Sequence, residues 1–385
     1  MREEEIKMDK KGILEPAALI SEPGEAYSLD FRKWQGCPTI ARTAGGRLWA
    51  GWYSGGICEP DENNYNLLVY SDDEGSTWSD PVLVIDSRPE IRLRAMDIQL
   101  WMDPAEKLWV FWTQTEDSEQ KDENGRCLEY TDGIFGVWAV TTQEPESSRP
   151  VWTPPVRISD GFLRCRPTVL SDQRILMCPY DWTHDRYAYN ISCDHGASWE
   201  RFFGTVKLYE TNCFDEAMAV ERRDGILWML VRTAHGALAQ TFSCDKGQSW
   251  LPAGLSGIEN PSSRFWIGRL QSGRLLLINH CDFVGRNRLT ALLSEDEGET
   301  WPWRLLLDER ENVSYPDAAE CADGSIFCIY DRERTDIGEI LLARFTEEDI
   351  FAGTMVSDGS YRKRCVSCCR SRIRSVGEEE ESDES

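Results

Sequence analysis

The octapeptide SDDEGSTW, residues Ser71–Trp78, recurs three more times along the chain. SCDHGASW begins at Ser192, SCDKGQSW at Ser243 and SEDEGETW at Ser294, so the last three copies are 51 residues apart. The longer interval between the first two copies leaves room for one more unit, whose degenerate motif we place in GVWAVTTQEPESSRPVW. A fixed period of this length indicates a repeat architecture.

The stretches between the motifs read as short strands. Runs rich in Val, Ile, Leu and Trp alternate with turns such as TAGGR, RRDGI, QSGRL and CADGS, which gives about four strands per 50 residues. Antiparallel four-stranded units at this period are typical of the blades of a β-propeller. We predict an all-β protein of six blades, over residues 37–85, 96–156, 164–208, 214–252, 264–307 and 315–345. The last range lacks an outer strand, and we expect the N-terminal segment ILEPAALI to supply it and close the ring.

The octapeptide itself is predicted to be a turn. Asp73 can accept hydrogen bonds from backbone N–H groups, Gly75 can adopt positive φ, and Trp78 can fold back onto the blade. An EF-hand calcium loop would need a different spacing and a terminal Glu, and the motif has neither.

Composition limits the function classes. The 385 residues include 41% hydrophobic residues and 16 Trp, enough for a large core in one closed domain. A net charge of −25 excludes nucleic acid as a partner, and no apolar run reaches the roughly 18 residues of a membrane span. The start, MREEEIKMDKKGILEP, is charged where a signal peptide would be apolar, so we expect a cytoplasmic protein. Residues 1–358 are assigned to the propeller and residues 359–385 to a disordered tail.

The 14 cysteines are predicted to be free thiols, because most stand alone within strand-like runs. Cys365, Cys368 and Cys369 form a CxxCC cluster in the tail, a pattern found in metal sites and palmitoylation sites. No paired Cys/His group accompanies the cluster. We therefore expect no metal and no cofactor.

The pattern S-x-D-x-G-x-[ST]-W is similar to the Asp-box, or BNR repeat, of the sialidase (neuraminidase) superfamily of six-bladed propellers. The resemblance covers roughly residues 30–345. It implies the fold and a glycosidase activity with a carbohydrate substrate. Asp-boxes also occur in other propellers, so the activity has to be argued from the residues that face the central cavity.

Two segments are similar to sialidase segments that contain active-site residues. NVSYPDAAECADGSIFCIYD is similar to the sialidase segment in which a Tyr opens the last blade, which implies that Tyr315 is the nucleophile. NCFDEAMAVERRDGILWMLVRT is similar to the segment that pairs a Glu with an Arg, which implies that Glu216 is the base and Arg232 a ligand of the substrate carboxylate. A neutral Tyr suits a sugar whose anomeric carbon bears a carboxylate, because a carboxylate nucleophile would meet a like charge.

Further roles follow from the same resemblance. In DFVGRNRLTALLSEDEGETW it implies a second carboxylate ligand, for which Arg286 fits best and Arg288 is the alternative. The general acid is expected in the long first-blade loop GGICEPDENNYN, where Asp61 is the candidate and Glu59 and Glu62 are neighbours.

One departure from the family concerns the third carboxylate ligand. Sialidases carry Arg-Ile-Pro or Arg-Leu-Pro on the first strand, and here WQGCPTIAR keeps Pro38 but has Gly36 at the Arg position. Arg32, Arg94 and Arg264 are possible replacements. The first strand of each blade should line the channel, where a mixed-charge funnel is expected from Arg94, Asp97, Arg166, Glu216, Arg264, Tyr315 and Asp317.

Three functions remain open. The first is an exo-acting, retaining glycosidase of sialidase type. The second is a sister hydrolase or lyase for another sugar, acting through Asp97, Glu216 or Asp317. The third is a carbohydrate-binding propeller without turnover. Gly36 favours the second over a strict sialidase, whereas Glu216, Arg232 and Tyr315 disfavour the third.

Overall fold

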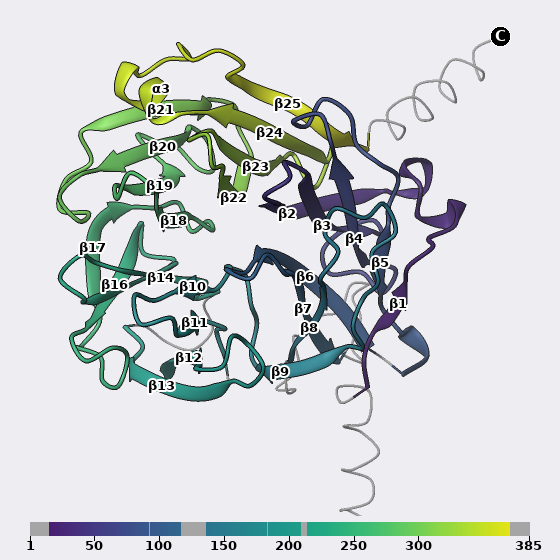
Figure 1. Ribbon diagram of the computed structural model, residues 1–385, viewed down its shortest axis with the longest axis horizontal. Helices are drawn as coiled ribbons and strands as arrows, with labels where there is room; N and C mark the ends of the chain where they lie inside the picture. Colours follow the sequence, from purple (N-terminus) through teal and green to yellow (C-terminus); the bar gives the residue numbers. More distant parts are fainter. Residues whose placement is uncertain (1–14, 92, 117–135, 183, 209–213, 370–385) are drawn as a thin grey trace, which may run out of the picture.

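Six antiparallel sheets stand around a central axis in the computed structural model, which describes residues 15–91, 93–116, 136–182, 184–208 and 214–369. In each sheet the strands follow chain order from the axis outward, except that β1 lies at the outer edge of the first sheet (Figure 1). The chain is therefore an all-β, six-bladed propeller, as the period of the octapeptide predicted. Within these ranges, no helix is long and apolar enough to span a membrane.

The blades follow one another in chain order. Blade 1 contains β2 (Trp34–Arg42), β3 (Leu48–Gly55), β4 (Tyr65–Ser71) and β5 (Leu83–Asp86). Blade 2 contains β6 (Leu93–Met102), β7 (Leu108–Glu116), β8 (Gly136–Thr142) and β9 (Val156–Asp160). Blade 3 contains β10 (Thr168–Val169), β11 (Ile175–Met177), β12 (Arg186–Ser192) and β13 (Glu200–Val206). Blade 4 contains β14 (Ala217–Glu221), β15 (Leu227–Val231), β16 (Ala237–Ser243) and β17 (Gly254–Glu259).

The last two blades complete the ring. Blade 5 contains β18 (Trp266–Arg269), β19 (Leu275–His280), β20 (Leu289–Ser294) and β21 (Trp303–Asp308). Blade 6 contains β22 (Val313–Glu320), β23 (Ile326–Arg332), β24 (Glu339–Phe345) and β25 (Tyr361–Cys368). A short helix, α3 (Glu347–Ala352), follows β24, and single 3-10 turns lie at Glu25–Tyr27, Leu29–Phe31 and Pro89–Ile91.

Two expectations about the chain ends are wrong. The outer strand of blade 6 is β25, which pairs with β24 along Glu339↔Cys368 to Arg344↔Tyr361. It occupies the outer edge of β24, where the N-terminal segment was expected, and strand β1 (Ala18–Ile20) instead pairs with β5 as a fifth strand of blade 1. The disordered tail predicted over residues 359–385 is wrong for residues 361–368, which form β25, and Tyr361 and Val366 of this strand pack against the core between blades 6 and 1. Residues 370–385 lie outside the described residues.

The hydrophobic core is divided into clusters that lie between neighbouring blades. One cluster joins Trp49 and Leu68 of blade 1 to Leu100 and Trp112 of blade 2. Other clusters join blade 1 to blade 6, blade 2 to blade 3 and blade 3 to blade 4, and the largest spans blades 4 to 6. Burial of apolar side chains between blades therefore holds the ring together, including the closing contact between the last blade and the first.

The four octapeptides are turns between the third and fourth strands of blades 1, 3, 4 and 5. In each turn the Ser hydroxyl donates to the Asp carboxylate at 2.8 Å. The same hydroxyl accepts the Gly N–H at 2.8–2.9 Å, and the Asp accepts a backbone N–H four residues on at 2.8–2.9 Å. The degenerate motif in blade 2 lies at the equivalent turn, between β8 and β9.

The glycine of the motif also allows close contact between blades. Gly75 has φ of 79°, and a Cβ atom there would lie 2.4 Å from Leu342 of blade 6. At Gly298 the Cβ would lie 2.3 Å from Trp228 of blade 4. Each of these turns thus packs against the preceding blade, where only Gly fits.

Three inner strands carry a bulge at the same level. The register of β2, β6 and β22 shifts between Gly36 and Thr39, between Met96 and Gln99, and between Ser314 and Asp317. The bulged residues Cys37, Asp97 and Tyr315 have φ of 57°, 62° and 56°, in the left-handed region. Such backbone costs free energy for a residue other than Gly, and bulges often redirect side chains at functional sites. Two of these residues, Asp97 and Tyr315, line the cavity described next.

Candidate active site

A cavity of about 220 Å³ opens where the inner strands begin. Every blade contributes to it, through the first half of an inner strand or through a loop at the same end of the blade. Its lining residues are Glu59, Met96, Asp97, Phe162, Arg164, Tyr180, Trp182, Phe214, Arg232, Arg286, Tyr315 and Arg334. With Glu216, which lies just behind Tyr315, these residues form a site rich in arginine and carboxylate groups.

Tyr315, Glu216 and Arg232 are in direct contact. The Tyr315 hydroxyl donates to Glu216 Oε1 at 2.9 Å, and Arg232 Nη1 lies 3.0 Å from the same hydroxyl. Arg232 Nη1 is also 3.1 Å from Glu216 Oε2. Glu216 directly precedes β14 and Arg232 directly follows β15, so strand pairing sets them side by side, with Arg232 N–H donating to the Glu216 carbonyl. The structure therefore brings together the three residues that the sequence analysis assigned to one site.

The charges around this triad differ in their effects. Burial opposes ionisation of Glu216, but Arg232 and Arg164 outweigh it and hold the pKa of this carboxyl below its usual value. Burial and the Glu216 carboxylate raise the pKa of Tyr315 to about 12. At neutral pH the pair therefore consists of a neutral phenol donating to a carboxylate, which is the arrangement that a base-activated tyrosine needs.

Arg164 is a central cation that sequence reasoning missed. Its guanidinium lies 2.6 Å from Asp97 Oδ1, 3.2 Å from Glu59 Oε1 and 3.7 Å from Glu216 Oε1. It also lies over the Tyr315 ring, 5.1 Å from the centroid. The loop before β10 that carries it, GFLRCRP, holds two arginines, and only the fold distinguishes the one that faces this cavity.

Asp97 has the most strongly perturbed carboxyl group of the cavity lining. It is 2% exposed, and burial raises its pKa to about 7 even though Arg164 favours the ionised form. Its charge therefore changes near neutral pH.

Arg334 occupies the space left by Gly36. A Cβ atom on Gly36 would lie 3.2 Å from both Cβ and Cδ of Arg334 and 3.2 Å from Asp331 Oδ2. The Arg334 guanidinium donates to Ser314 Oγ at 2.8 Å, lies 3.4 Å from Asp331 and stacks over Tyr315 at 4.3 Å from the ring centroid. It comes from the loop between β23 and β24, at the far end of the chain from β2.

Arg334, Arg232 and Arg286 together give the cavity three arginines besides Arg164. Arg286 donates to the Ser262 carbonyl at 2.7 Å and lies over Tyr315 at 5.8 Å from the centroid. Arg288, the alternative to Arg286, does not line the cavity, and its Nε donates to the Cys281 carbonyl at 3.2 Å. Of the three replacements named for the missing arginine, none lines the cavity: Arg32 donates to the Tyr27 carbonyl at 3.0 Å, and Arg94 and Arg264 are buried elsewhere.

The first-blade loop presents Glu59 to the cavity and not Asp61. The Asp61 carboxylate accepts hydrogen bonds from the backbone N–H groups of Ile57 at 3.0 Å and Asn63 at 2.9 Å. It therefore shapes the loop, and neither it nor Glu62 lines the cavity. Glu59 is 3.2 Å from Arg164 and 3.5 Å from Arg334, at the cavity wall.

Arg264 and Asp317 form part of a buried polar layer below the cavity. Asp317 accepts hydrogen bonds from Thr39 Oγ1 at 2.5 Å and Gln99 Nε2 at 3.0 Å, and Arg264 lies 3.4 Å from its other oxygen. Each of three residues in this layer follows a bulged residue by two positions: Thr39, Gln99 and Asp317. The side chains of these three residues point toward one another, whereas the bulged residues Asp97 and Tyr315 face the cavity. The two predicted site residues, Arg264 and Asp317, belong to this floor.

One wall of the cavity is aromatic. Phe162 stacks on Tyr180 with ring centroids 5.1 Å apart, and Trp182 lies 4.9 Å from Phe162 and 5.6 Å from Phe214. Sugars present C–H faces that pack well on such rings. Among the described residues, no group of His, Cys, Asp and Glu side chains is placed to hold a metal ion.

Known proteins share this architecture. An intramolecular trans-sialidase from Ruminococcus gnavus superposes with a TM-score of 0.64 at 16% identity, covering 86% of this chain and 98% of the other. A Hadza microbial sialidase gives 0.65 at 19% identity, covering 83% and 67%. A protein of unknown function from Dyadobacter fermentans gives 0.65 at 17% identity, covering 86% and 97%. At these identities the similarity concerns the fold alone.

Sequence comparison gives the family. No curated protein sequence matches the chain. The model of the BNR repeat-like domain matches residues 21–328, which include all four octapeptide turns and most of the cavity. The chain therefore belongs to the family of proteins built on the BNR repeat-like domain.

Proposed function

We propose that the protein is an exo-acting, retaining glycoside hydrolase that releases a terminal sugar bearing a carboxylate. The observation that carries the proposal is the contact of Tyr315 with Glu216 and Arg232 in a cavity with further arginines. A buried phenol that donates to a buried carboxylate is a nucleophile with its base already in place. The sialidases among the structural neighbours support the same class of chemistry.

The arginines support a negatively charged substrate. Arg232, Arg286 and Arg334 each lie near Tyr315, so a carboxylate next to the anomeric carbon would meet all three. Guanidinium groups bind carboxylates through paired hydrogen bonds. The cavity volume of about 220 Å³ lies below the range of roughly 300–1,000 Å³ of drug-sized ligand pockets, which favours one sugar ring and hence exo action.

The proposed reaction has two steps. Glu216 takes the proton of Tyr315 as the phenolate oxygen attacks the anomeric carbon, and Glu59 protonates the departing oxygen of the aglycone. Water then attacks the tyrosyl-bound sugar from the other side, with Glu59 accepting its proton and Glu216 returning one to Tyr315. Two inversions give net retention of configuration.

Glu59 and Asp97 receive different roles because they differ in depth. The Glu59 side chain is 19% exposed and lies on a loop at the cavity mouth, where the aglycone leaves. The Asp97 side chain is 1% exposed, at the deep end beside Arg164. We assign Glu59 as the proton donor and Asp97 to a hydrogen bond with a ring hydroxyl, with the aromatic wall packing against the sugar face.

The proposal is tested by a panel of aryl glycosides that includes a sialoside, an aryl uronide and neutral hexosides. We expect turnover of a carboxylated member, with the released sugar formed first in the anomeric configuration of the substrate as followed by NMR. Turnover of neutral hexosides only would refute the role of the arginines. An unsaturated product that absorbs in the ultraviolet would identify a lyase, and saturable binding without turnover would identify a binding protein.

A further inference from the structure

A second cavity, of about 820 Å³, lies at the opposite ends of the inner strands. It is lined by Met102 at the end of β6, Ser171 just after β10, Glu221 at the end of β14 and Arg269 at the end of β18. The first cavity takes its residues from the beginnings of inner strands. The two cavities therefore open on opposite faces of the propeller, and the layer of Arg264, Asp317, Gln99 and Thr39 lies between them.

Most cations in this second cavity are paired with carboxylates. Lys246, in the octapeptide of blade 4, forms an ion pair with Glu221. Arg269 lies 2.6 Å and Arg223 3.2 Å from Glu297, in the octapeptide of blade 5. Arg222 lies 3.0 Å from Glu299 of the same octapeptide. These pairs neutralise one another, as expected of charges at a protein surface.

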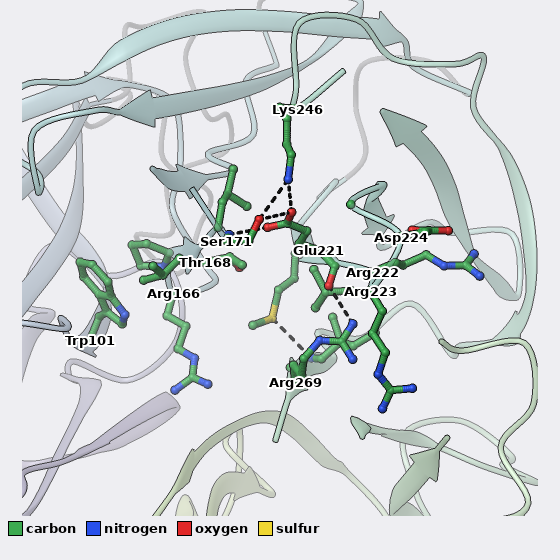
Figure 2. A pocket seen from close by; sticks show the side chains of 18 of the residues that line it. Trp101, Arg166, Thr168, Ser171, Glu221, Arg222, Arg223, Asp224, Lys246 and Arg269 are labelled. Atoms are coloured by element: carbon green, nitrogen blue, oxygen red, sulfur yellow. Dashed lines mark hydrogen bonds and ion pairs between the residues drawn. The ribbon is translucent and has the colours of Figure 1, made fainter. Parts of the chain in front are cut away.

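Arg166 is different, because its guanidinium has no hydrogen-bond or ion-pair partner among the described residues. Figure 2 shows its side chain directed away from Lys246 and Glu221, with no dashed line to another of the residues drawn. It lies over the Trp266 ring at 4.9 Å from the centroid. The two carboxylates that favour its charged form have other partners: Asp317 accepts from Gln99 Nε2 at 3.0 Å, and Glu320 accepts from the backbone N–H of Gln271 at 2.9 Å.

An unpaired, partly buried guanidinium is costly to a folded protein. Burial accordingly lowers the pKa of Arg166, although the group stays charged. In a chain with a net charge of −25, a cation without a carboxylate partner is unexpected on electrostatic grounds. An anionic ligand would supply the missing partner.

The walls near Arg166 define the rest of the ligand. The apolar lining residues of the cavity include Trp101 and Met102 of blade 2 and Met218, Val220 and Ile267 of blades 4 and 5. These apolar surfaces suit a ring or a short carbon skeleton. We propose that this cavity is a second binding site, for a small ligand that carries an oxyanion, a carboxylate or a phosphate, held by paired hydrogen bonds from Arg166. The proposal does not depend on the glycosidase activity.

The site is tested by calorimetric titration of the full chain with sodium phosphate, sodium glucuronate and, as the neutral control, glucose. We expect one of the two anions to bind saturably and Arg166→Gln to weaken that binding about tenfold or more. Arg222→Gln is the matched control, because it removes a paired guanidinium from the same cavity, and it should leave the affinity within about twofold. Equal affinities of wild type and Arg166→Gln would overturn the proposal, as would the absence of saturable anion binding.

Thermal unfolding without ligand distinguishes a role of Arg166 in protein stability from a role in anion binding. Because the guanidinium has no hydrogen-bond or ion-pair partner among the described residues and lies only over the Trp266 ring, Arg166→Gln should unfold within about two degrees of the wild type or at a higher temperature. Arg166→Lys keeps the charge but not the paired geometry, so it should bind the anion more weakly than wild type and more tightly than Arg166→Gln. A Tm of Arg166→Gln that falls by several degrees would show that the residue serves stability and would contradict the proposal.

Discussion

The two faces of the propeller use aspartate in opposite ways. On the face of the octapeptide turns, Asp296 is exposed and accepts hydrogen bonds from the Thr300 hydroxyl and N–H, which lower its pKa to about 2. On the face of the first cavity, Asp97 is buried on a bulge and its pKa is raised to about 7. Among the described residues, the turn hydrogen bonds of Asp296 recur in four blades, whereas a buried Asp on a bulge with a pKa near 7 occurs only at position 97.

This difference separates the residues that build the fold from those that can carry chemistry. A group that is repeated in several blades satisfies the same local hydrogen bonds in each, so it serves the blade. Tyr315 does not repeat in this way: the equivalent bulge of blade 1 carries Cys37. The bulge therefore does not need a Tyr for its own structure. The following predictions test this distinction, from the largest expected effect to the smallest.

Tyr315→Phe should lower kcat by about a thousandfold or more, because the nucleophilic oxygen is lost while the ring remains. Tyr180→Phe is the matched control, since it removes a hydroxyl from the same cavity without touching Glu216, and we expect less than a tenfold effect. Steady-state kinetics on the best aryl glycoside measures both. Comparable losses in the two variants would contradict the assignment of the nucleophile.

Glu59→Gln should lower kcat/KM about a hundredfold for alkyl glycosides and less than tenfold for 4-nitrophenyl glycosides, because a good leaving group needs no proton. Asp61→Asn should affect both substrates to the same degree, since Asp61 shapes the loop through Ile57 and Asn63. If the dependence on the leaving group appeared in Asp61→Asn instead, the proton donor would be Asp61.

Arg334→Met should raise KM for a carboxylated substrate by about 10- to 100-fold with a smaller change in kcat, because one charge-assisted contact to the carboxylate is lost. Gly36→Arg alone should be poorly tolerated, since its Cβ would lie 3.2 Å from Arg334. The double variant Gly36→Arg, Arg334→Ala should recover part of the affinity. An unchanged KM in Arg334→Met would remove Arg334 from the carboxylate clamp.

The pH dependence should follow Asp97. With a pKa of about 7, Asp97 is neutral below that pH and negatively charged above it. The charged form repels an anionic substrate, so kcat/KM should fall by about tenfold as pH rises through 7 at constant ionic strength. Asp97→Asn should abolish this decline, and its persistence in that variant would assign the titration to another group.

Asp73→Ala should lower the free energy of unfolding by about 1 kcal/mol, because the turn loses hydrogen bonds from Thr77 and Ser71 that are partly exposed. Denaturant unfolding measures the loss, and Asp296→Ala should give a similar value in blade 5. For both variants kcat/KM should stay within twofold. A selective loss of activity would place the octapeptide in the site and erase the contrast between the two faces.

The sequence predicted the blades and part of the site for identifiable reasons. The octapeptides reveal the period because their hydrogen bonds are local. Glu216 and Arg232 were paired through the resemblance to a sialidase segment, and the structure places them at the two ends of one hairpin. Arg334 could not be predicted, because its proximity to Gly36 depends on how blade 6 closes on blade 1. Glu59 and Asp61 are two residues apart, and the choice between them depends on the backbone hydrogen bonds of one loop. Strand β25 was missed because its basic residues hide the apolar side chains that pack on blade 1.

The closed ring of contiguous blades has an evolutionary consequence. Each blade is one contiguous segment of the chain, and the first and last described strands, β1 and β25, lie at outer edges of blades 1 and 6. One blade could therefore be duplicated or deleted by a single recombination event without rethreading the rest. The cavity does not share this freedom. Its charged groups come from all six blades: Glu59, Asp97, Arg164, Arg232, Arg286 and Arg334. Selection for the chemistry would therefore hold the number of blades constant in a fold that could otherwise vary it.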